Sequence, residues 1–335
     1  MELSPRRGAR VTFRATLAAA AILCGSIAPL AAQDAHLAVI VGLSGDPEHG
    51  ELFQKWGSAL VEAAATRYAI PRDRIVHLVE KGSAGTSTKE GIAKAIDGIA
   101  GRAAAEDVVF IVLIGHGTFD GRVAKFNLPG PDMAAADFAP LLKRLEPRRV
   151  VLVNTASASG PFIEALSGAG RTIVTATRSG SERFATLFGG FFVDALTTEE
   201  GDADRNGKVS VLEAFNHARR EVTAAYEREG IMVTEHALLD DTGDKEGTAA
   251  PSADGKEGRV AAILSLGSTT AAAAPPADPR VRALHEERRA LERRVESLRL
   301  LKDSMEPQRY ASELEKALTA LALKSREIRD AGGVK

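Results

Sequence analysis

Residues 107–117 read DVVFIVLIGHG, and residues 148–160 read RRVVLVNTASASG. Each stretch starts with an almost continuous apolar run and ends in small and polar residues. Apolar runs of this length, without polar alternation, are typical of parallel strands that are covered by helices on both faces. The two stretches therefore predict two central strands of a parallel sheet, over 107–114 and 148–154.

The sequence around these two strands alternates between strand-like and helix-like segments. Three further strands are predicted over 36–43, 74–79 and 171–176. Helical periodicity predicts helices over 51–68, 88–102, 135–145, 161–166 and 183–196. The turn-rich stretch 118–131 is long enough for a small hairpin. Strands separated by helices indicate βαβ units, so the sequence predicts an α/β domain over residues 33–242 with a mainly parallel central sheet.

Composition excludes several classes of protein. The chain has 335 residues, of which 44% are hydrophobic and 26% charged, and these are globular proportions. Its formal net charge of −2 gives no electrostatic reason to expect nucleic acid as a partner. Cys24 is the one cysteine, which excludes disulfides within the chain and zinc sites built from cysteines.

The N-terminus has the pattern of a targeting segment. An apolar stretch from Leu17 to Ile27, which contains Cys24, is followed by Leu30-Ala31-Ala32, which offers a cleavage site of the small-residue type. Four arginines precede it: Arg6, Arg7, Arg10 and Arg14. This pattern predicts a signal peptide over residues 1–32 and an exported protein, periplasmic or extracellular, with no membrane contact after cleavage. An uncleaved N-terminal anchor is the alternative. No later apolar stretch approaches the roughly 18 residues that a membrane-spanning helix needs.

The C-terminal third differs in composition from the α/β domain. Residues 243–279 are rich in Gly, Ala and Pro and predict a linker, in which 260–266 could form an edge strand. Over residues 280–330, apolar side chains recur every seven positions at Leu284, Leu291, Leu298 and Met305. Such a pattern predicts either a helical hairpin that packs on its own domain or a coiled coil that drives self-association.

The ends of the two central strands carry the candidate catalytic residues. Gly115-His116-Gly117 follows the first strand, and Ala156-Ser157-Ala158-Ser159-Gly160 follows the second. Active sites in open parallel sheets gather at these carboxyl ends. A strand ending in His-Gly, followed by a strand ending in a nucleophile among small residues, resembles the caspase-like and legumain-like peptidases. The opening AVIVGLSGD, residues 38–46, is similar to the start of legumain.

The resemblance covers residues 36–242 and implies a caspase-like three-layer sandwich with a cleft for a peptide or protein ligand. In that family a histidine is the catalytic base or acid, a cysteine is the nucleophile, and two backbone N–H groups form the oxyanion hole. His116 matches the histidine and Gly117 the oxyanion glycine. Ser157 stands where the family has its cysteine, so the resemblance implies no cysteine peptidase here.

Three interpretations follow, and they leave open whether the protein is an enzyme. The first is a non-catalytic peptidase homologue that binds a peptide or protein, because a serine hydroxyl lacks the ready ionisation of a thiol. The second is an active peptidase that uses Ser157 and His116. The third is a structural scaffold assembled through the C-terminal helices.

A second motif, DADRNGKVSVLE over residues 202–213, matches an EF-hand calcium loop. Ca²⁺ takes six to eight oxygen ligands, which this spacing gathers around one point, with glycine at position six for the sharp turn. The predicted ligands are Asp202, Asp204, Asn206, Lys208 through its carbonyl, Ser210 and Glu213. The alternative is an Asp/Asn-rich turn that caps the next helix. The later DDTGD, residues 240–244, lacks the full spacing and is interpreted as a solvated turn.

Overall fold

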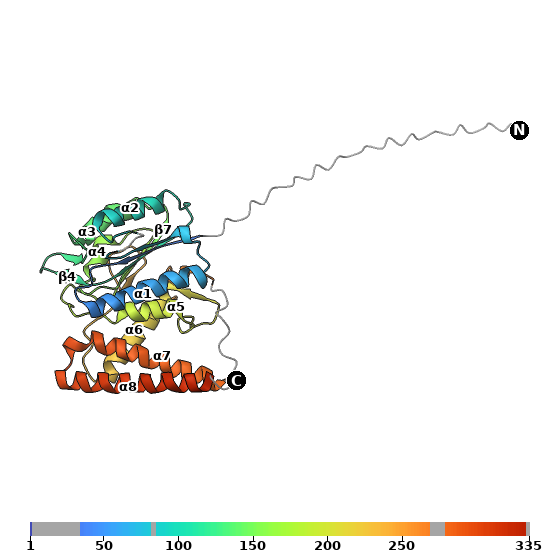
Figure 1. Ribbon diagram of the computed structural model, residues 1–335. Coiled ribbons are helices and arrows are strands. Elements are labelled where there is room, and N and C mark those ends of the chain that lie inside the picture. Colours follow the sequence, from blue (N-terminus) through green and yellow to red (C-terminus); the bar gives the residue numbers. More distant parts are fainter. Residues whose placement is uncertain (2–33, 82–84, 269–278, 333–335) are drawn as a thin grey trace. The chain divides into compact units, whose positions relative to one another are not determined.

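The computed structural model describes Met1 and residues 34–81, 85–268 and 279–332 (Figure 1). Its centre is a six-stranded sheet with the strand order β10-β8-β7-β3-β1-β2. The strands are β1 (Ala35–Val41), β2 (Ile75–Leu78), β3 (Val108–Ile114), β7 (Arg149–Asn154), β8 (Arg171–Thr175) and β10 (Leu238–Asp240). The first five run parallel, and β10 pairs antiparallel with β8. The predicted mainly parallel α/β sheet is confirmed. The predicted signal peptide, residues 1–32 with Cys24, lies outside the described residues.

Helices cover both faces of the sheet, which gives three layers (Figure 1). One face carries α1 (Pro47–Thr66), α5 (Phe188–Thr197) and α6 (Val211–Arg228), and the other carries α2 (Lys89–Ala100), α3 (Ala135–Lys143) and α4 (Pro161–Leu166). Alternate residues of each central strand pack against opposite helix layers. In β3, Val112 belongs to one buried hydrophobic cluster and Ile111 to the other. Every residue of β3 is buried, as the continuous apolar run predicts for a strand covered on both sides.

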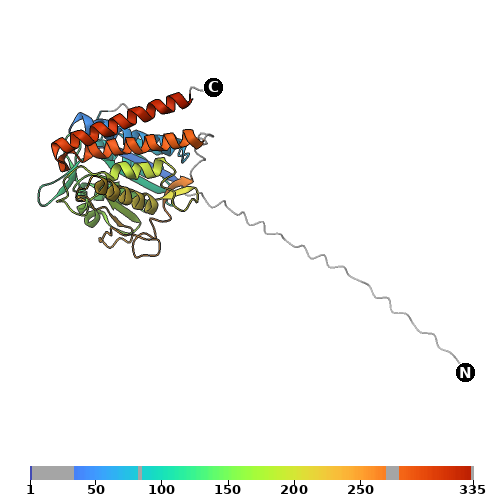
Figure 2. The same cartoon turned by 90° about the horizontal axis from the view of Figure 1, so that it is seen from below.

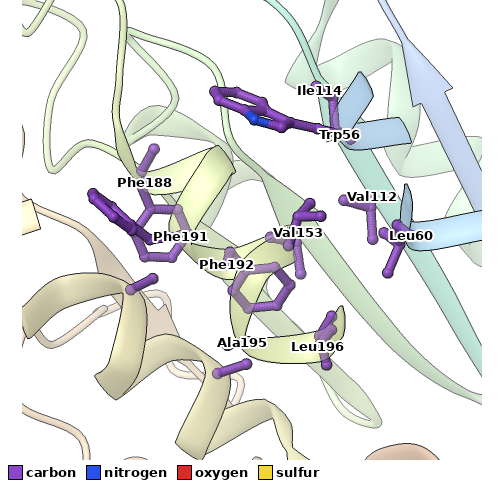
Figure 3. Packing of buried hydrophobic residues seen from close by; sticks show 14 of the residues in the cluster. Trp56, Leu60, Val112, Ile114, Val153, Phe188, Phe191, Phe192, Ala195 and Leu196 are labelled. Carbon is purple, nitrogen blue, oxygen red and sulfur yellow. The ribbon is translucent and has the colours of Figure 1, made fainter. Parts of the chain in front are cut away.

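The layer around α5 is packed closely against α1 and the sheet (Figure 3). Phe188, Phe191 and Phe192 of α5 lie in the same buried cluster as Val153 of β7. A Cβ at Gly190 of α5 would lie 2.7 Å from the Trp56 ring of α1. Glycine at this position therefore allows the indole to lie directly on the α5 backbone, which fixes the distance between the two helices.

Two small sheets complete the domain. The hairpin expected over 118–131 is present as β4 (Gly117–Phe119) and β5 (Ala124–Phe126), to which β6 (Met133–Ala134) is added. A short 3-10 turn, η1 (Arg72–Arg74), precedes β2. The second sheet pairs β9 (Lys208–Ser210) with β11 (Ser265–Ser268).

Residues 243–268 of the predicted linker pack on the domain. Thr248 exchanges backbone hydrogen bonds with Leu239, and Ala261, Leu264 and Leu266 are buried in the core cluster. The edge strand expected over 260–266 is found as β11, slightly later in the chain. Regular apolar periodicity is weak here, so the composition alone does not reveal this packing. Residues 269–278 lie outside the described part of the chain.

The C-terminal helices α7 (Pro279–Leu300) and α8 (Pro307–Gly332) lie side by side as a hairpin, joined through η2 (Lys302–Ser304) (Figure 2). Leu298, Leu301 and Met305 are buried in the same cluster as α1 and α5. Arg299 pairs with Glu48 of α1 at 3.4 Å. Of the four heptad residues, Leu298 and Met305 thus belong to this chain's own core, as the hairpin alternative expects, and self-association through 280–330 stays a prediction. Within the described residues, no helix has the length and apolar character that crossing a membrane requires.

Candidate active site and candidate calcium loop

The two strand ends singled out in the sequence meet at one edge of the sheet. β3 and β7 are parallel neighbours in register up to Leu113 and Asn154, so the loops that follow them leave from the same side. A Cβ at Gly117 would lie 2.1 Å from the Ser157 carbonyl oxygen. Only glycine permits this approach, which brings His116, Gly117 and Ser157 into one small region.

Ser157 is buried, and its hydroxyl is held by the Gly117 backbone. The Oγ donates to the Gly117 carbonyl oxygen at 3.1 Å and accepts from the Gly117 N–H at 3.3 Å. The next residue, Ala158, has a φ of 54° and donates its N–H to the Glu182 carbonyl oxygen at 2.8 Å. A left-handed alanine is uncommon, and this turn fixes the direction in which the Ser157 hydroxyl points.

His116 is half-buried and forms its hydrogen bond with the loop after β1. Its Nε2 lies 3.1 Å from the Ser44 carbonyl oxygen; since a carbonyl only accepts, Nε2 carries the proton and Nδ1 the lone pair. Burial lowers the pKa of His116 below its ordinary 6.5, and the neighbouring His49 lowers it further. The imidazole is therefore neutral at pH 7. Across the described residues, no hydrogen bond joins His116 to the Ser157 hydroxyl.

Three residues beside His116 were missed by the sequence analysis. The His49 ring meets the His116 ring edge-on with centroids 4.6 Å apart, and Phe53 lies 5.0 Å from it on another side. Asp46 accepts from His49 Nδ1 at 2.6 Å and from the His49 backbone N–H at 2.9 Å. Asp46 is the N-cap of α1, and its spacing of three from His49 is the signal that could have indicated the pair.

This arrangement limits the chemistry available to Ser157. A serine nucleophile needs a base within hydrogen-bond reach of its hydroxyl, and a third group that orients the base. The His116 imidazole lies in the same region, but the hydroxyl proton points at the Gly117 carbonyl oxygen instead. The hydroxyl oxygen also occupies the Gly117 N–H, which is the group that would stabilise an oxyanion.

The loop 202–213 gathers its acidic residues as the spacing predicts. One carboxylate oxygen each from Asp202, Asp204 and Glu213 lies within 4.8 Å of the others. Gly207 has a φ of 80° at the sharp turn, and its N–H donates to Asp202 Oδ2 at 2.9 Å. Asn206 accepts from the Lys208 N–H at 2.9 Å. Such a set of closely spaced carboxylates suits a hard cation such as Ca²⁺.

Ser210 and Glu213 also begin the following helix. The Ser210 backbone N–H donates to Glu213 Oε2 at 2.9 Å, and the Ser210 hydroxyl accepts from the Glu213 N–H at 3.2 Å. This is a capping box for α6, so both alternatives for the loop, a calcium site and a helix cap, have contacts in the structure. Lys208 and Ser210 lie on β9, which β11 fastens to the domain.

Comparison with known proteins identifies the part of the chain that carries these features. The peptidase C13 family model matches residues 88–238, which include His116, Gly117, Ser157 and the loop 202–213. No curated protein matches the chain. A similar solved structure is that of the Drosophila initiator caspase Dronc, with 11% identity, a TM-score of 0.39, and coverage of 64% of this chain and 81% of the caspase chain. The segment that brings the two strand ends together, residues 88–238, therefore matches the model of the peptidase C13 family.

Proposed function

We propose that the protein is an exported, non-catalytic relative of the C13 peptidases, stabilised by calcium, that binds a peptide or protein at the strand-end surface around His116 and Ser157. The observation that carries this proposal is the hydrogen bonding of the Ser157 hydroxyl, which is shared with the Gly117 backbone and not with His116. A thiol in this position could react through its ionised form without such a contact, whereas a hydroxyl could not.

Two large apolar side chains are exposed on segments that adjoin the strand-end loops in sequence. Phe184, in the segment between β8 and α5, is 48% exposed, and Val123, next to β5, is 41% exposed. Glu182 of the same segment as Phe184 binds the turn after Ser157. An exposed aromatic beside a fixed turn is a common anchor point for a protein ligand.

A fluorophosphonate probe tests the non-catalytic proposal, because it reacts with serine hydroxyls that a base activates. We expect no label on Ser157 in the purified protein, as measured by mass spectrometry of the intact chain and its fragments. The Ser157→Ala variant is the matched control for background labelling. A label on Ser157 in the native protein, absent from the alanine variant, would favour the active serine peptidase instead.

We further propose that the loop 202–213 binds Ca²⁺. The convergence of Asp202, Asp204 and Glu213 supports it, and so does the turn at Gly207. Three carboxylates in an exported protein fit the weak affinity of extracellular calcium modules, with a Kd of about 0.1–1 mM. The ion would fix the segment between α5 and α6, both of which pack on the sheet.

Removing one charge from this loop tests the calcium proposal. At about 10 mM Ca²⁺, a Kd of about 0.1–1 mM gives roughly 1.4–2.7 kcal/mol of stabilisation. We expect Glu213→Gln to lose this stabilisation, and with it the corresponding part of the calcium-dependent rise in Tm. Glutamine retains the capping box but not the negative charge that binds the ion. Glu199→Gln, an exposed change just before the loop, is the control. An equal calcium-dependent rise in both variants would contradict the proposal.

The proposed export rests on the sequence pattern of residues 1–32. The experiment is to express the full chain with a C-terminal tag and determine the N-terminal residue of the mature protein. We expect cleavage after Ala32. A mature protein that retains residues 1–32 would support the uncleaved anchor.

A further inference from the structure

A second group of carboxylates lies where the sheet ends at β10. One carboxylate oxygen each from Asp240, Asp244 and Glu257 lies within 4.8 Å of the others. Asp240 is 0% exposed, Asp241 is 7% exposed and Glu257 is 6% exposed. The sequence interpretation of residues 240–244 as a solvated turn is therefore wrong for its first two residues, because the segment 251–261 folds back over them.

The Asp240 carboxylate is only half satisfied. Its Oδ1 accepts from the N–H groups of Thr242 and Gly243 at 3.1 Å and 2.9 Å. Its Oδ2 is enclosed and has no hydrogen-bond partner in the described part of the chain. An unsatisfied buried carboxylate oxygen is costly, and one that lies among other carboxylates points to a bound cation.

Charge balance leads to the same conclusion. Glu257 accepts from the Asp241 N–H at 2.8 Å and from the Thr242 hydroxyl at 2.6 Å, both neutral donors. Among the residues that the structure describes, Lys256 is the cation at this cluster. Its side chain is exposed and pairs with Asp244. Buried like charges of this kind need a cation or a proton between them.

The segment repeats the local arrangement of the first loop. Asp240, Thr242 and Asp244 have the spacing of positions one, three and five, and Lys245 has a φ of 72° at position six, where the first loop has Gly207 at 80°. In both loops the N–H of position two donates to the glutamate: Ala203 to Glu213, and Asp241 to Glu257. The second glutamate simply comes from further along the chain.

We propose that Asp240, Asp244 and Glu257 bind a second Ca²⁺ ion, with the Thr242 hydroxyl beside it. The donors are all oxygens, which suit Ca²⁺ and not the softer metals. The ion supplies the charge that the buried carboxylates lack and the partner that Asp240 Oδ2 lacks. It closes residues 241–257 onto the end of β10.

The second site is connected to the first loop through a short backbone path. Asp241 accepts from the N–H groups of Gly258 and Ala261, both at 2.8 Å. The Ala261 carbonyl oxygen accepts from the Leu212 N–H at 3.1 Å, next to Glu213. The two ions therefore fasten the two ends of the same packed segment.

Calcium stoichiometry tests the proposal without reference to catalysis. The full chain, first stripped of metal with a chelator, is dialysed to equilibrium against radioactive Ca²⁺ at about 0.05–5 mM, a range that brackets extracellular calcium modules. We expect two ions per chain for the native protein, one for Glu213→Gln, one for Asp244→Asn and none for the double variant. Asp244 is exposed, so its substitution leaves the fold intact. Asp240→Asn is expected to lose the same ion.

The control is Asp254→Asn, an exposed charge change in the same segment, which should still bind two ions. One ion in the native protein, lost in Glu213→Gln and kept in Asp244→Asn, would overturn the second site and leave the first. An ion count that Asp240→Asn and Asp244→Asn both leave unchanged would also overturn it, because a proton then neutralises the cluster. One ion kept in Glu213→Gln and lost in Asp244→Asn would uphold the second site and contradict the first.

Discussion

Replacing Phe188 by alanine is expected to lower the free energy of unfolding by about 3–5 kcal/mol. Phe188 is fully buried at the start of α5. Its ring stacks on Phe192 with centroids 5.7 Å apart and is tilted against Phe215 of α6 at 5.9 Å. The side chain thus joins the two helices that flank the proposed calcium loop. Urea unfolding followed by circular dichroism measures the change.

Phe184→Ala is the matched control for this substitution. Phe184 is 48% exposed just ahead of α5, so the same deletion of a ring should change stability by less than about 0.5 kcal/mol. Equal losses in the two variants would mean that Phe188 does not hold the α5–α6 layer as described.

Glu235→Gln should change the pH dependence of stability by about 2–3 kcal/mol between pH 5 and pH 8. Glu235 is buried and accepts from the Leu187 and Phe188 N–H groups at the start of α5, at 2.8 Å and 3.1 Å. Burial raises its pKa from 4.5 to about 7. Between these values the native state holds a proton that the unfolded chain has lost. The contribution of Glu235 to the free energy of unfolding is therefore fully present below pH 4.5 and is lost as the pH rises through 7.

Glutamine mimics the protonated carboxyl, so the variant lacks this loss. Relative to the native protein, we expect Glu235→Gln to gain stability as the pH rises from 5 to 8. Above pH 8 the difference in the free energy of unfolding between the two proteins should stay constant. Urea titrations across this range measure it, with Glu227→Gln, exposed on α6, as control. A difference that does not vary with pH would show that Glu235 is ionised in the folded protein throughout.

The sheet could be predicted from sequence because its central strands carry an unambiguous signal. The apolar runs of β3 and β7 are found within one residue of their predicted limits. Helix starts were predicted less well where a cap sets them. α1 begins at Pro47, ahead of the predicted start at residue 51, because Asp46 accepts from the His49 N–H. Such capping contacts are local, but they leave the periodicity of the apolar residues unchanged. Helix prediction from that periodicity therefore does not detect them.

Tertiary contacts explain what the sequence did not reveal. β10 is a three-residue edge strand with no apolar run of its own, and it is held by pairing with β8. The packing of residues 243–268 depends on hydrogen bonds to α6 and to Asp241. The proximity of His116, Gly117 and Ser157 was predictable because parallel strands end at one edge. The contacts of His116 with Ser44 and His49 were not, since they depend on the course of the loop after β1 and on where α1 begins.

Peptide turnover by the purified protein tests the central proposal most directly. The native protein, Ser157→Ala and His116→Ala would be assayed side by side on a broad fluorogenic peptide library, in millimolar calcium and in chelator. Because the Ser157 hydroxyl is bonded to Gly117 and not to His116, we predict no turnover above that of Ser157→Ala in either condition. Turnover in the native protein that disappears in both variants would contradict the non-catalytic proposal and establish a serine peptidase.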